Sequence, residues 1–201
     1  MRKLSISFYR QADVVQIAKK LLGKYFFSRI GGELTGGIIA ETEAYAGITD
    51  KASHAYNGRR TTRTEIMYLP GGVSYVYFTY GMHHLFNVVT NKKDVPDAVL
   101  IRGILPVEGI DIMVRRRGIN NRKQLCNGPA KLCQAMGITL EHNALNLTGD
   151  LLWIADNGFS VPEEKIVTTP RIGVDYAGDD ALLPYRMIYR HPDYLPVKNR
   201  K

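Results

Sequence analysis

The chain has 201 residues, of which 45% are apolar and 23% charged, as in ordinary globular domains of this size. Its 27 Lys and Arg exceed its 19 Asp and Glu by eight, which favours a polyanionic partner, nucleic acid first and an anionic membrane surface second. Two cysteines outside any CxxC pair argue against a disulfide scaffold and against zinc. No apolar run reaches membrane-spanning length and no signal-peptide core opens the chain, so we expect a cytoplasmic protein without a membrane partner.

The first half of the chain predicts one helix followed by strands. Asp13 is a fitting N-cap for a helix whose apolar residues lie on one stripe, and Gly23 suits its end. Two strands then flank Gly31 and Gly32, at Tyr25–Ile30 and Leu34–Tyr45. Residues 46–64 are polar and basic and are typical of a long functional loop.

The second half continues with short strands and two helices. A proline opens each predicted helix, and the expected elements are strands Val73–Tyr80, Leu85–Thr90, Ala98–Ile104, Leu151–Ile154 and Tyr185–Tyr189, and helices Pro106–Arg117 and Pro129–Ala135. Strands and helices do not alternate strictly. We therefore predict one α+β domain over residues 1–201, with a mostly antiparallel sheet.

A pair of glutamates closes the second strand. With a side-chain period of two, Glu41, Glu43 and Tyr45 point to one face, and the two carboxylates stand roughly 6.5–7 Å apart. Like charges at this separation tend to raise one pKa, as a general acid or base requires. For an isolated pair of this kind a solvated strand edge is the commoner explanation. The hypothesis of catalysis therefore depends on the neighbouring Tyr45, the basic loop and His54.

Cations and aromatic residues follow in the positions expected of a nucleic-acid surface. The loop carries Arg59, Arg60 and Arg63 among threonines, which suits phosphate contacts but is also typical of a solvated charge run. Tyr80 stands at the end of an aromatic strand before Gly81, where burial is difficult, and is a candidate wedge between base pairs. The segment around Lys131 opens a helix whose free N–H groups could bind an anion.

Taken together, several segments resemble the alkyladenine (3-methyladenine) DNA glycosylase family. The resemblance covers about Ile38 to Ile138 and weakens towards Tyr189. The order and spacing of the motifs make it specific, and the segments that carry it are ETEAY (41–45), His54, GGVSYVYFTYGM (71–82), Asn87, VLIRGILPVEG (99–109) and NGPAKLCQAMGI (127–138).

The resemblance implies a role for each matching residue. Glu43 resembles the general base that activates water, and Arg102 the arginine that holds the flipped nucleotide's phosphate. Tyr45 and Tyr77 resemble the walls that sandwich the base. The remaining matches are His54 as a further wall and donor, Asn87 as the group that crowds guanine, and Tyr80 and Met82 on the DNA-inserting hairpin. From the basic loop and the helix start, we expect DNA contacts at Arg59, Arg60, Arg63 and Lys131.

The same resemblance implies a fold, a substrate and a reaction. The fold would be a curved, mostly antiparallel sheet with peripheral helices and a protruding hairpin. The enzyme would be a monomeric, monofunctional glycosylase that needs no metal or cofactor and releases 3-methyladenine, 7-methylguanine, hypoxanthine and ethenoadenine from double-stranded DNA. His83 and His84, predicted at the hairpin tip, depart from the apolar residues expected there.

Other functions compete with this hypothesis. A basic sheet with exposed aromatics also suits a non-catalytic module for single-stranded nucleic acid. Glu41, Glu43 and Asp50 could bind a metal in a nuclease, and the glutamate spacing falls within the range of inverting carbohydrate hydrolases, although neighbours on one strand cannot easily flank a bond. The last third is less informative: its cations could contact backbone phosphate or nothing at all, and they are Arg171, Lys198, Arg200 and Lys201.

Overall fold

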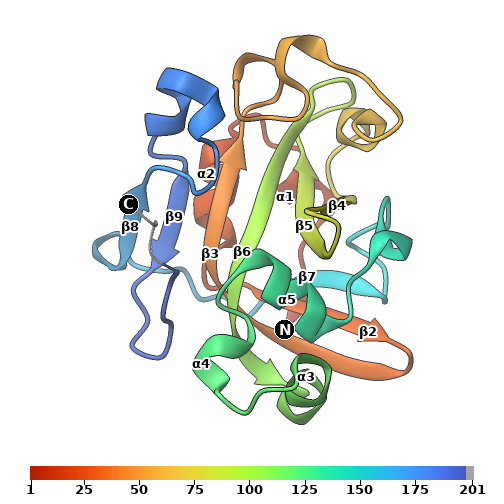
Figure 1. The fold of residues 1–201 in the computed structure, drawn as a ribbon, viewed down its shortest axis with the longest axis vertical. Helices are drawn as coiled ribbons and strands as arrows, with labels where there is room; N and C mark the ends of the chain where they lie inside the picture. Colours follow the sequence, from red (N-terminus) through yellow and green to blue (C-terminus); the bar gives the residue numbers. More distant parts are fainter. Residues whose placement is uncertain (198–201) are drawn as a thin grey trace.

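The computed structural model describes residues 1–197 and arranges them around one curled sheet (Figure 1). Nine strands of the described chain form it, all paired antiparallel, in the order β1-β7-β2-β3-β6-β5-β4, with β9 on β3 and β8 on β9. The strands are β1 (Arg2–Lys3), β2 (Tyr25–Ile30), β3 (Glu33–Tyr45), β4 (Ser74–Thr79), β5 (His83–Thr90), β6 (Asp97–Glu108), β7 (Leu152–Asp156), β8 (Ile166–Thr169) and β9 (Arg186–Tyr189). The predicted α+β class is confirmed.

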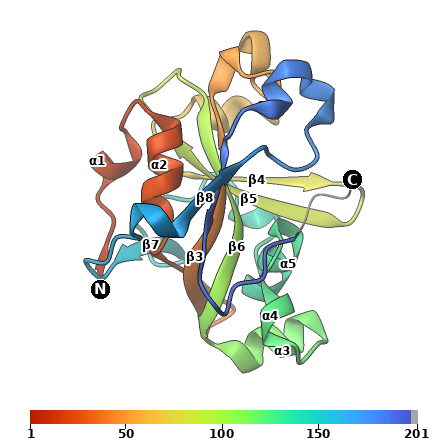
Figure 2. The ribbon, with the colours of Figure 1, turned by 90° about the vertical axis from the view of Figure 1, so that its left-hand side faces the viewer.

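The helices lie on both sides of the long β3–β6 pair, as Figure 2 shows. They are α1 (Ile6–Tyr9), α2 (Val14–Leu21), α3 (Ile110–Arg117), α4 (Arg122–Leu125) and α5 (Pro129–Met136). α1 and α2 cover one side, α3 to α5 the other, and the β4–β5 hairpin extends away on the side of α5. No helix in residues 1–197 has the length and apolar character needed to cross a membrane.

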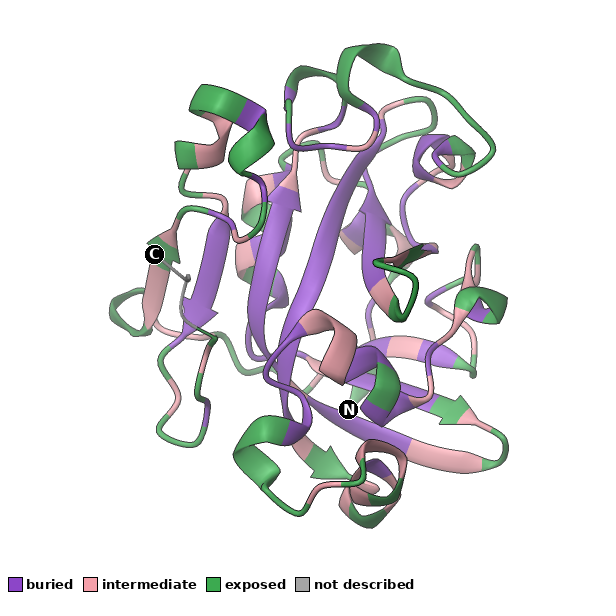
Figure 3. Cartoon of the chain, viewed as in Figure 1, coloured by how far each residue is buried: buried purple, intermediate pink, exposed green. Residues whose placement is uncertain are grey.

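The sheet curls strongly enough to close over its own core. Phe26 of β2 and Phe86 of β5 are separated by two strands in the sheet order, yet their rings stack with centroids 4.5 Å apart. Register shifts in β3 between Ile39 and Thr42 interrupt its pairing with β6 and bend the strand. The middle of β3 and of β6 is buried, while the hairpin tip is exposed (Figure 3).

Local sequence signals placed several boundaries correctly. The Asp13 carboxylate accepts a hydrogen bond from the Gln16 N–H at 3.0 Å and caps α2, and Gly23 follows its end with a φ of 79°. Gly118 ends α3 in the left-handed region, where glycine is favoured.

The prediction of a helix from Pro106 was wrong. β6 continues through Pro106 to Glu108, with Leu105 opposite Ile38 and Pro106 opposite Gly37, and α3 begins only at Ile110. Gly109, with a φ of 63°, makes the turn between strand and helix. A proline at the first helical position and a proline near a strand end give the same local signal, and pairing with β3 decided between them.

Candidate active site

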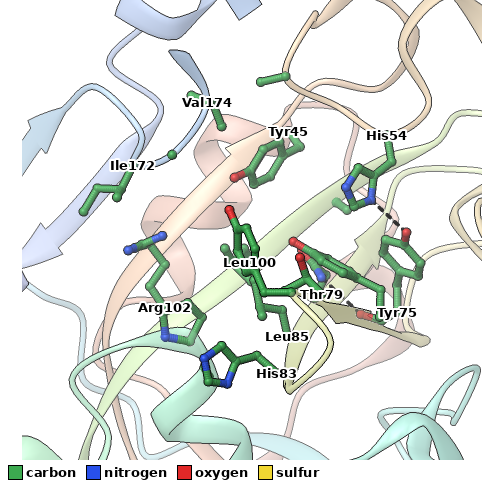
Figure 4. A pocket seen from close by; sticks show the side chains of 18 of the residues that line it. Tyr45, His54, Tyr75, Thr79, His83, Leu85, Leu100, Arg102, Ile172 and Val174 are labelled. Carbon is green, nitrogen blue, oxygen red and sulfur yellow. Dashed lines mark hydrogen bonds between the residues drawn. The ribbon is translucent and has the colours of Figure 1, made fainter. Parts of the chain in front are cut away.

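A cavity of about 410 Å³ opens where the ends of β3, β4, β5 and β6 meet the loops that follow β3 and β8. Its size suits one nucleotide base, and its walls combine aromatic rings with a few polar groups (Figure 4). Seven of the residues predicted from the sequence line it: Tyr45, His54, Arg63, Tyr77, Tyr80, Asn87 and Arg102.

Glu43 is fully buried and does not itself line this cavity, but it contacts three residues that do, Tyr45, Arg102 and Ile172. Its Oε2 accepts a hydrogen bond from the Tyr45 hydroxyl at 2.9 Å, and its Oε1 accepts one from the Ile172 N–H at 2.8 Å. The Arg102 Nη1 stands 3.3 Å from the same Oε1. The carboxylate is therefore held in one orientation by groups on three different segments, as a catalytic base must be.

Arg102 lies between the two glutamates of β3 instead of leaving them to repel each other. Its Nε donates to the Glu41 Oε1 at 2.8 Å, while its outer nitrogens face Glu43 and the cavity. Burial opposes the charge on Arg102, but the carboxylates of Glu43 and Glu41 outweigh it and raise the pKa of the guanidinium. The side chain thus stays cationic at the cavity wall, where a phosphate or a developing charge could contact it.

Two tyrosines supply broad aromatic surface to the cavity. Tyr45 comes from the end of β3 and Tyr77 from β4. The Arg171 guanidinium lies over the Tyr45 ring, 4.8 Å from its centroid, and the Arg63 guanidinium lies over the Tyr77 ring at the same distance. Burial raises the pKa of both phenols, so both rings remain neutral. Such rings can stack on a base and attract a cationic one.

His54 faces the cavity from the loop after β3 and is fixed by Tyr75. Its Nδ1 lies 2.8 Å from the Tyr75 hydroxyl, and its ring stands edge-on to Tyr77 with centroids 4.7 Å apart. Burial, together with the positive charges of Arg63 and Arg59, lowers the pKa of His54 to about 4. The imidazole is therefore neutral at pH 7. Because burial raises the pKa of Tyr75, that hydroxyl keeps its proton, and donating it to Nδ1 would leave the His54 proton on Nε2.

Asn87 lies on β5 opposite Tyr75 and is buried at the cavity wall. Its Nδ2 donates to the Tyr75 backbone carbonyl at 3.1 Å, which fixes the amide plane. The side chain therefore projects a rigid polar group beside the base-sized space, as steric selection between purines would require.

The hairpin between β4 and β5 presents an exposed aromatic residue at its tip. Thr79 pairs with His83, so the turn consists of Tyr80, Gly81 and Met82. Tyr80 is 83% exposed and Met82 69%. The prediction that His83 and His84 form the tip was wrong, because both belong to β5 and pair with Thr79 and Phe78. Apolar bulk therefore stands at the tip.

Tyr80 also adopts a strained backbone. Its φ is +52°, in the left-handed region, and the following Gly81 has a φ of +66°. Bulky residues rarely adopt this conformation, and they do so mostly where function retains them. The tip thus holds a large aromatic residue where a glycine would fit with less strain.

The cations predicted to contact DNA differ in whether other side chains already bind them. Arg60 forms a two-bond ion pair with Glu65, contacts Asp94 and lies over the Tyr68 ring, whereas Arg59 is exposed. Lys131 donates to the Asn127 side chain at 2.9 Å beside a second hollow at the start of α5.

Arg171, a candidate phosphate contact from the sequence, is buried. Its Nη2 donates to Asp50 at 2.8 Å and its Nη1 to the Ala44 carbonyl at 2.9 Å, so it joins two loops behind Tyr45. It therefore cannot face a DNA backbone. Lys198, Arg200 and Lys201 lie outside the described residues.

Two parts of the site escaped prediction. Tyr75 shares a strand face with Tyr77, which was visible in the sequence, but its contact with His54 was not. The segment 172–176 lines the cavity with Ile172, Gly173, Val174 and Tyr176, although it consists of a loop and the start of a short 3-10 helix without a distinctive motif. Nothing local could show that this loop packs against Glu43, which is 129 residues away in the chain.

The carboxylates proposed for a metal-dependent nuclease do not form a metal site. Glu41 accepts hydrogen bonds from Arg102, Arg186 and Tyr194, and Asp50 is paired with Arg171. Among residues 1–197, no three His, Cys, Asp or Glu side chains converge as metal ligands do.

An aromatic cavity that fits one base, a buried carboxylate with an arginine at its edge and an exposed aromatic residue on a hairpin together define a DNA glycosylase, a hydrolase of N-glycosyl bonds. The profile of the methylpurine-DNA glycosylase family matches residues 7–192. The chain therefore belongs to that family, and its substrate is DNA that carries damaged bases.

Relatives similar over nearly their whole length support this assignment. A protein of Chlamydia abortus is 50% identical over 96% of this chain and 98% of its own, and one of Clostridium acetobutylicum is 46% identical over 87% and 88%. One of Bacillus cereus is 44% identical over 92% of this chain and 95% of its own. Each bears the name "Putative 3-methyladenine DNA glycosylase".

Proposed function

We propose that this enzyme everts 3-methyladenine, 7-methylguanine, hypoxanthine and ethenoadenine from duplex DNA and hydrolyses the bond to the sugar, with Glu43 as general base. The observation that carries the proposal is the buried Glu43 carboxylate, fixed by Tyr45, Arg102 and the Ile172 N–H at the edge of a base-sized aromatic cavity.

Recognition follows from stacking between Tyr45 and Tyr77. Eversion costs a few kcal/mol, and least for a damaged, weakly paired base. Stacking on an aromatic ring contributes about 1–3 kcal/mol per ring, so two walls roughly offset eversion and leave lesions favoured. Alkylation at N3 or N7 makes the base cationic, which suits the electron-rich ring faces.

Neutral lesions require a hydrogen-bond donor instead of charge. Neutral His54, with its Nδ1 at the Tyr75 hydroxyl, can present an Nε2–H to hypoxanthine or ethenoadenine. Asn87, whose amide is fixed at the cavity wall, would crowd the exocyclic amine of guanine and so select against undamaged guanine.

The reaction itself places water between Glu43 and the sugar. Glu43 takes a proton from this water as it attacks C1′, and its charge stabilises the oxocarbenium character that develops there. Arg102 holds the flipped nucleotide's phosphate and helps to orient the water. No lysine lines the cavity among residues 1–197, which supports the proposal that the enzyme is monofunctional and forms no Schiff base with DNA.

The hairpin keeps the duplex open during this reaction. Tyr80 enters the gap that the everted nucleotide leaves, Met82 packs beside it, and cations at Arg59, Arg60, Arg63 and Lys131 contact the backbone.

The test is base release from duplexes that each carry one defined lesion, with chelator present. Glu43→Gln preserves the shape of the side chain but removes the base, so it should bind lesion DNA like the wild type and release the base about 10²–10⁴-fold more slowly. Normal excision by this variant would refute the assignment of Glu43. Binding without release by the wild type would favour a non-catalytic binding module.

A further inference from the structure

Glu41 is a buried carboxylate that the proposed reaction does not use. It is 1% exposed and does not line the cavity, yet three side chains donate to it. The Arg102 Nε lies 2.8 Å and the Arg186 Nε 2.7 Å from its Oε1, and the Tyr194 hydroxyl lies 2.6 Å from its Oε2. Charge-assisted hydrogen bonds of this kind are strong and directional, so Glu41 is fixed on all sides.

Tyr194 reaches this carboxylate because β6 has a glycine beneath it. A Cβ on Gly103 would meet the Tyr194 hydroxyl oxygen at 1.9 Å, a separation that no side chain tolerates. Glycine weakens a strand interior, so its presence next to Arg102 is explained by the close approach of the hydroxyl. Burial and the charge of Glu41 raise the pKa of Tyr194, which therefore stays a donor.

The contacts of Arg102 show what this network accomplishes. A guanidinium has five N–H donors and prefers a bidentate pair with one carboxylate. Here Glu41 takes the Nε, and Glu43 receives only an Nη1 at the longer distance of 3.3 Å. Without Glu41, Arg102 would be free to turn and form a bidentate pair with Glu43. That pair would occupy the lone pair on the Glu43 Oε2 that the Tyr45 hydroxyl leaves open and that a general base needs.

We propose that Glu41 and Tyr194 are positioning residues for the reaction: they hold the Arg102 guanidinium in a plane that leaves Glu43 free to act and the outer nitrogens directed at the cavity. Arg186 balances the second negative charge, so two carboxylates and two guanidinium groups share the buried cluster. This inference rests on the proposed function of Glu43 and Arg102.

Tyr194→Phe tests the inference because it removes one hydroxyl and almost no volume. Tyr9→Phe is the matched control, since the Tyr9 hydroxyl is buried without a hydrogen-bond partner in the described chain and lies on α1, outside the cavity. The measurements are the single-turnover rate of base release at saturating enzyme, the Kd for lesion DNA and the Tm. Glu41→Gln provides a second, stronger perturbation of the same network.

The expected result separates chemistry from binding and stability. Tyr194→Phe should slow single-turnover release about tenfold or more, as misorientation of a reacting group does, with Kd within twofold of the wild type. Glu41→Gln should be slower still, and Tyr9→Phe should match the wild type in rate. An unchanged rate of base release in Tyr194→Phe would overturn the inference, whether or not its Tm is lower. A decrease in rate matched by an equal weakening of affinity for lesion DNA would overturn it as well. If the wild type itself released no base, the proposed function would fail instead.

Discussion

Replacement of Tyr80 by glycine should affect stability and activity in opposite directions. The side chain is 83% exposed, so its removal loses little burial, while its φ of +52° is a conformation that costs an ordinary residue about 1–2 kcal/mol. Glycine relieves this strain but adds about 0.5–1 kcal/mol of chain entropy to the unfolded state. The net change is a gain of about 0–1.5 kcal/mol, or roughly 0–6 °C in Tm for a chain of this size.

The activity of the same variant should fall. A wedge that fills the gap in the duplex replaces about one stacking contact, which contributes about 1–3 kcal/mol, and its loss should lower the equilibrium for eversion by roughly 5- to 150-fold. Thermal unfolding measures the first effect, and single-turnover base release with subsaturating enzyme measures the second.

Tyr80→Ala is the control that separates strain from the wedge. It also removes the ring but keeps a Cβ at positive φ, so it should be as inactive as Tyr80→Gly and less stable. Its affinity for undamaged DNA should fall less than its eversion of the lesion. Destabilisation by Tyr80→Gly of more than about 1 kcal/mol would refute the strain argument, and equal losses on damaged and undamaged DNA would refute the wedge.

Three further predictions concern the cavity. The pKa of His54 is lowered to about 4, so its neutral form stabilises the fold above pH 6.5. That contribution is lost as the pH falls from 6.5 towards 4. Urea unfolding across this range should therefore show a smaller decrease in the free energy of unfolding for His54→Gln than for the wild type. A loss of equal size in both proteins would contradict the burial of neutral His54. Asn87→Ala should increase the release of undamaged guanine relative to hypoxanthine, measured by competition between two labelled duplexes, and an unchanged ratio would remove Asn87 from base selection. Excess EDTA should leave base release unaltered, and borohydride should trap no covalent complex with DNA; a trapped adduct would identify a lyase.

The local elements were predictable because their causes lie within a few residues. An N-cap at Asp13 acts on the N–H three residues later, and the alternation of β3 depends only on the period of a strand. Pro106 was misread for the same reason, since its local preference fits a helix start and a strand end alike, and only pairing with β3 distinguished them.

The candidate site was predictable only where one strand or one resemblance carried it. Glu43 and Tyr45 lie two residues apart on β3, so their contact at 2.9 Å follows from the strand period. Arg171 was misjudged as a surface cation because its charge is visible in the sequence, while its burial against Asp50 depends on how two distant loops pack.

The sequence alone therefore determined that Glu43 and Tyr45 share a face of β3, the aromatic character of the hairpin and the excess of positive charge. The tertiary structure alone decided that Ile172 reaches Glu43 and that Arg186 and Tyr194 reach Glu41, over separations of 129, 145 and 153 residues. The physical reason is range: backbone period and capping act within one strand or one turn. Contacts across the site depend on the curl of the whole sheet and on which loops fold over it.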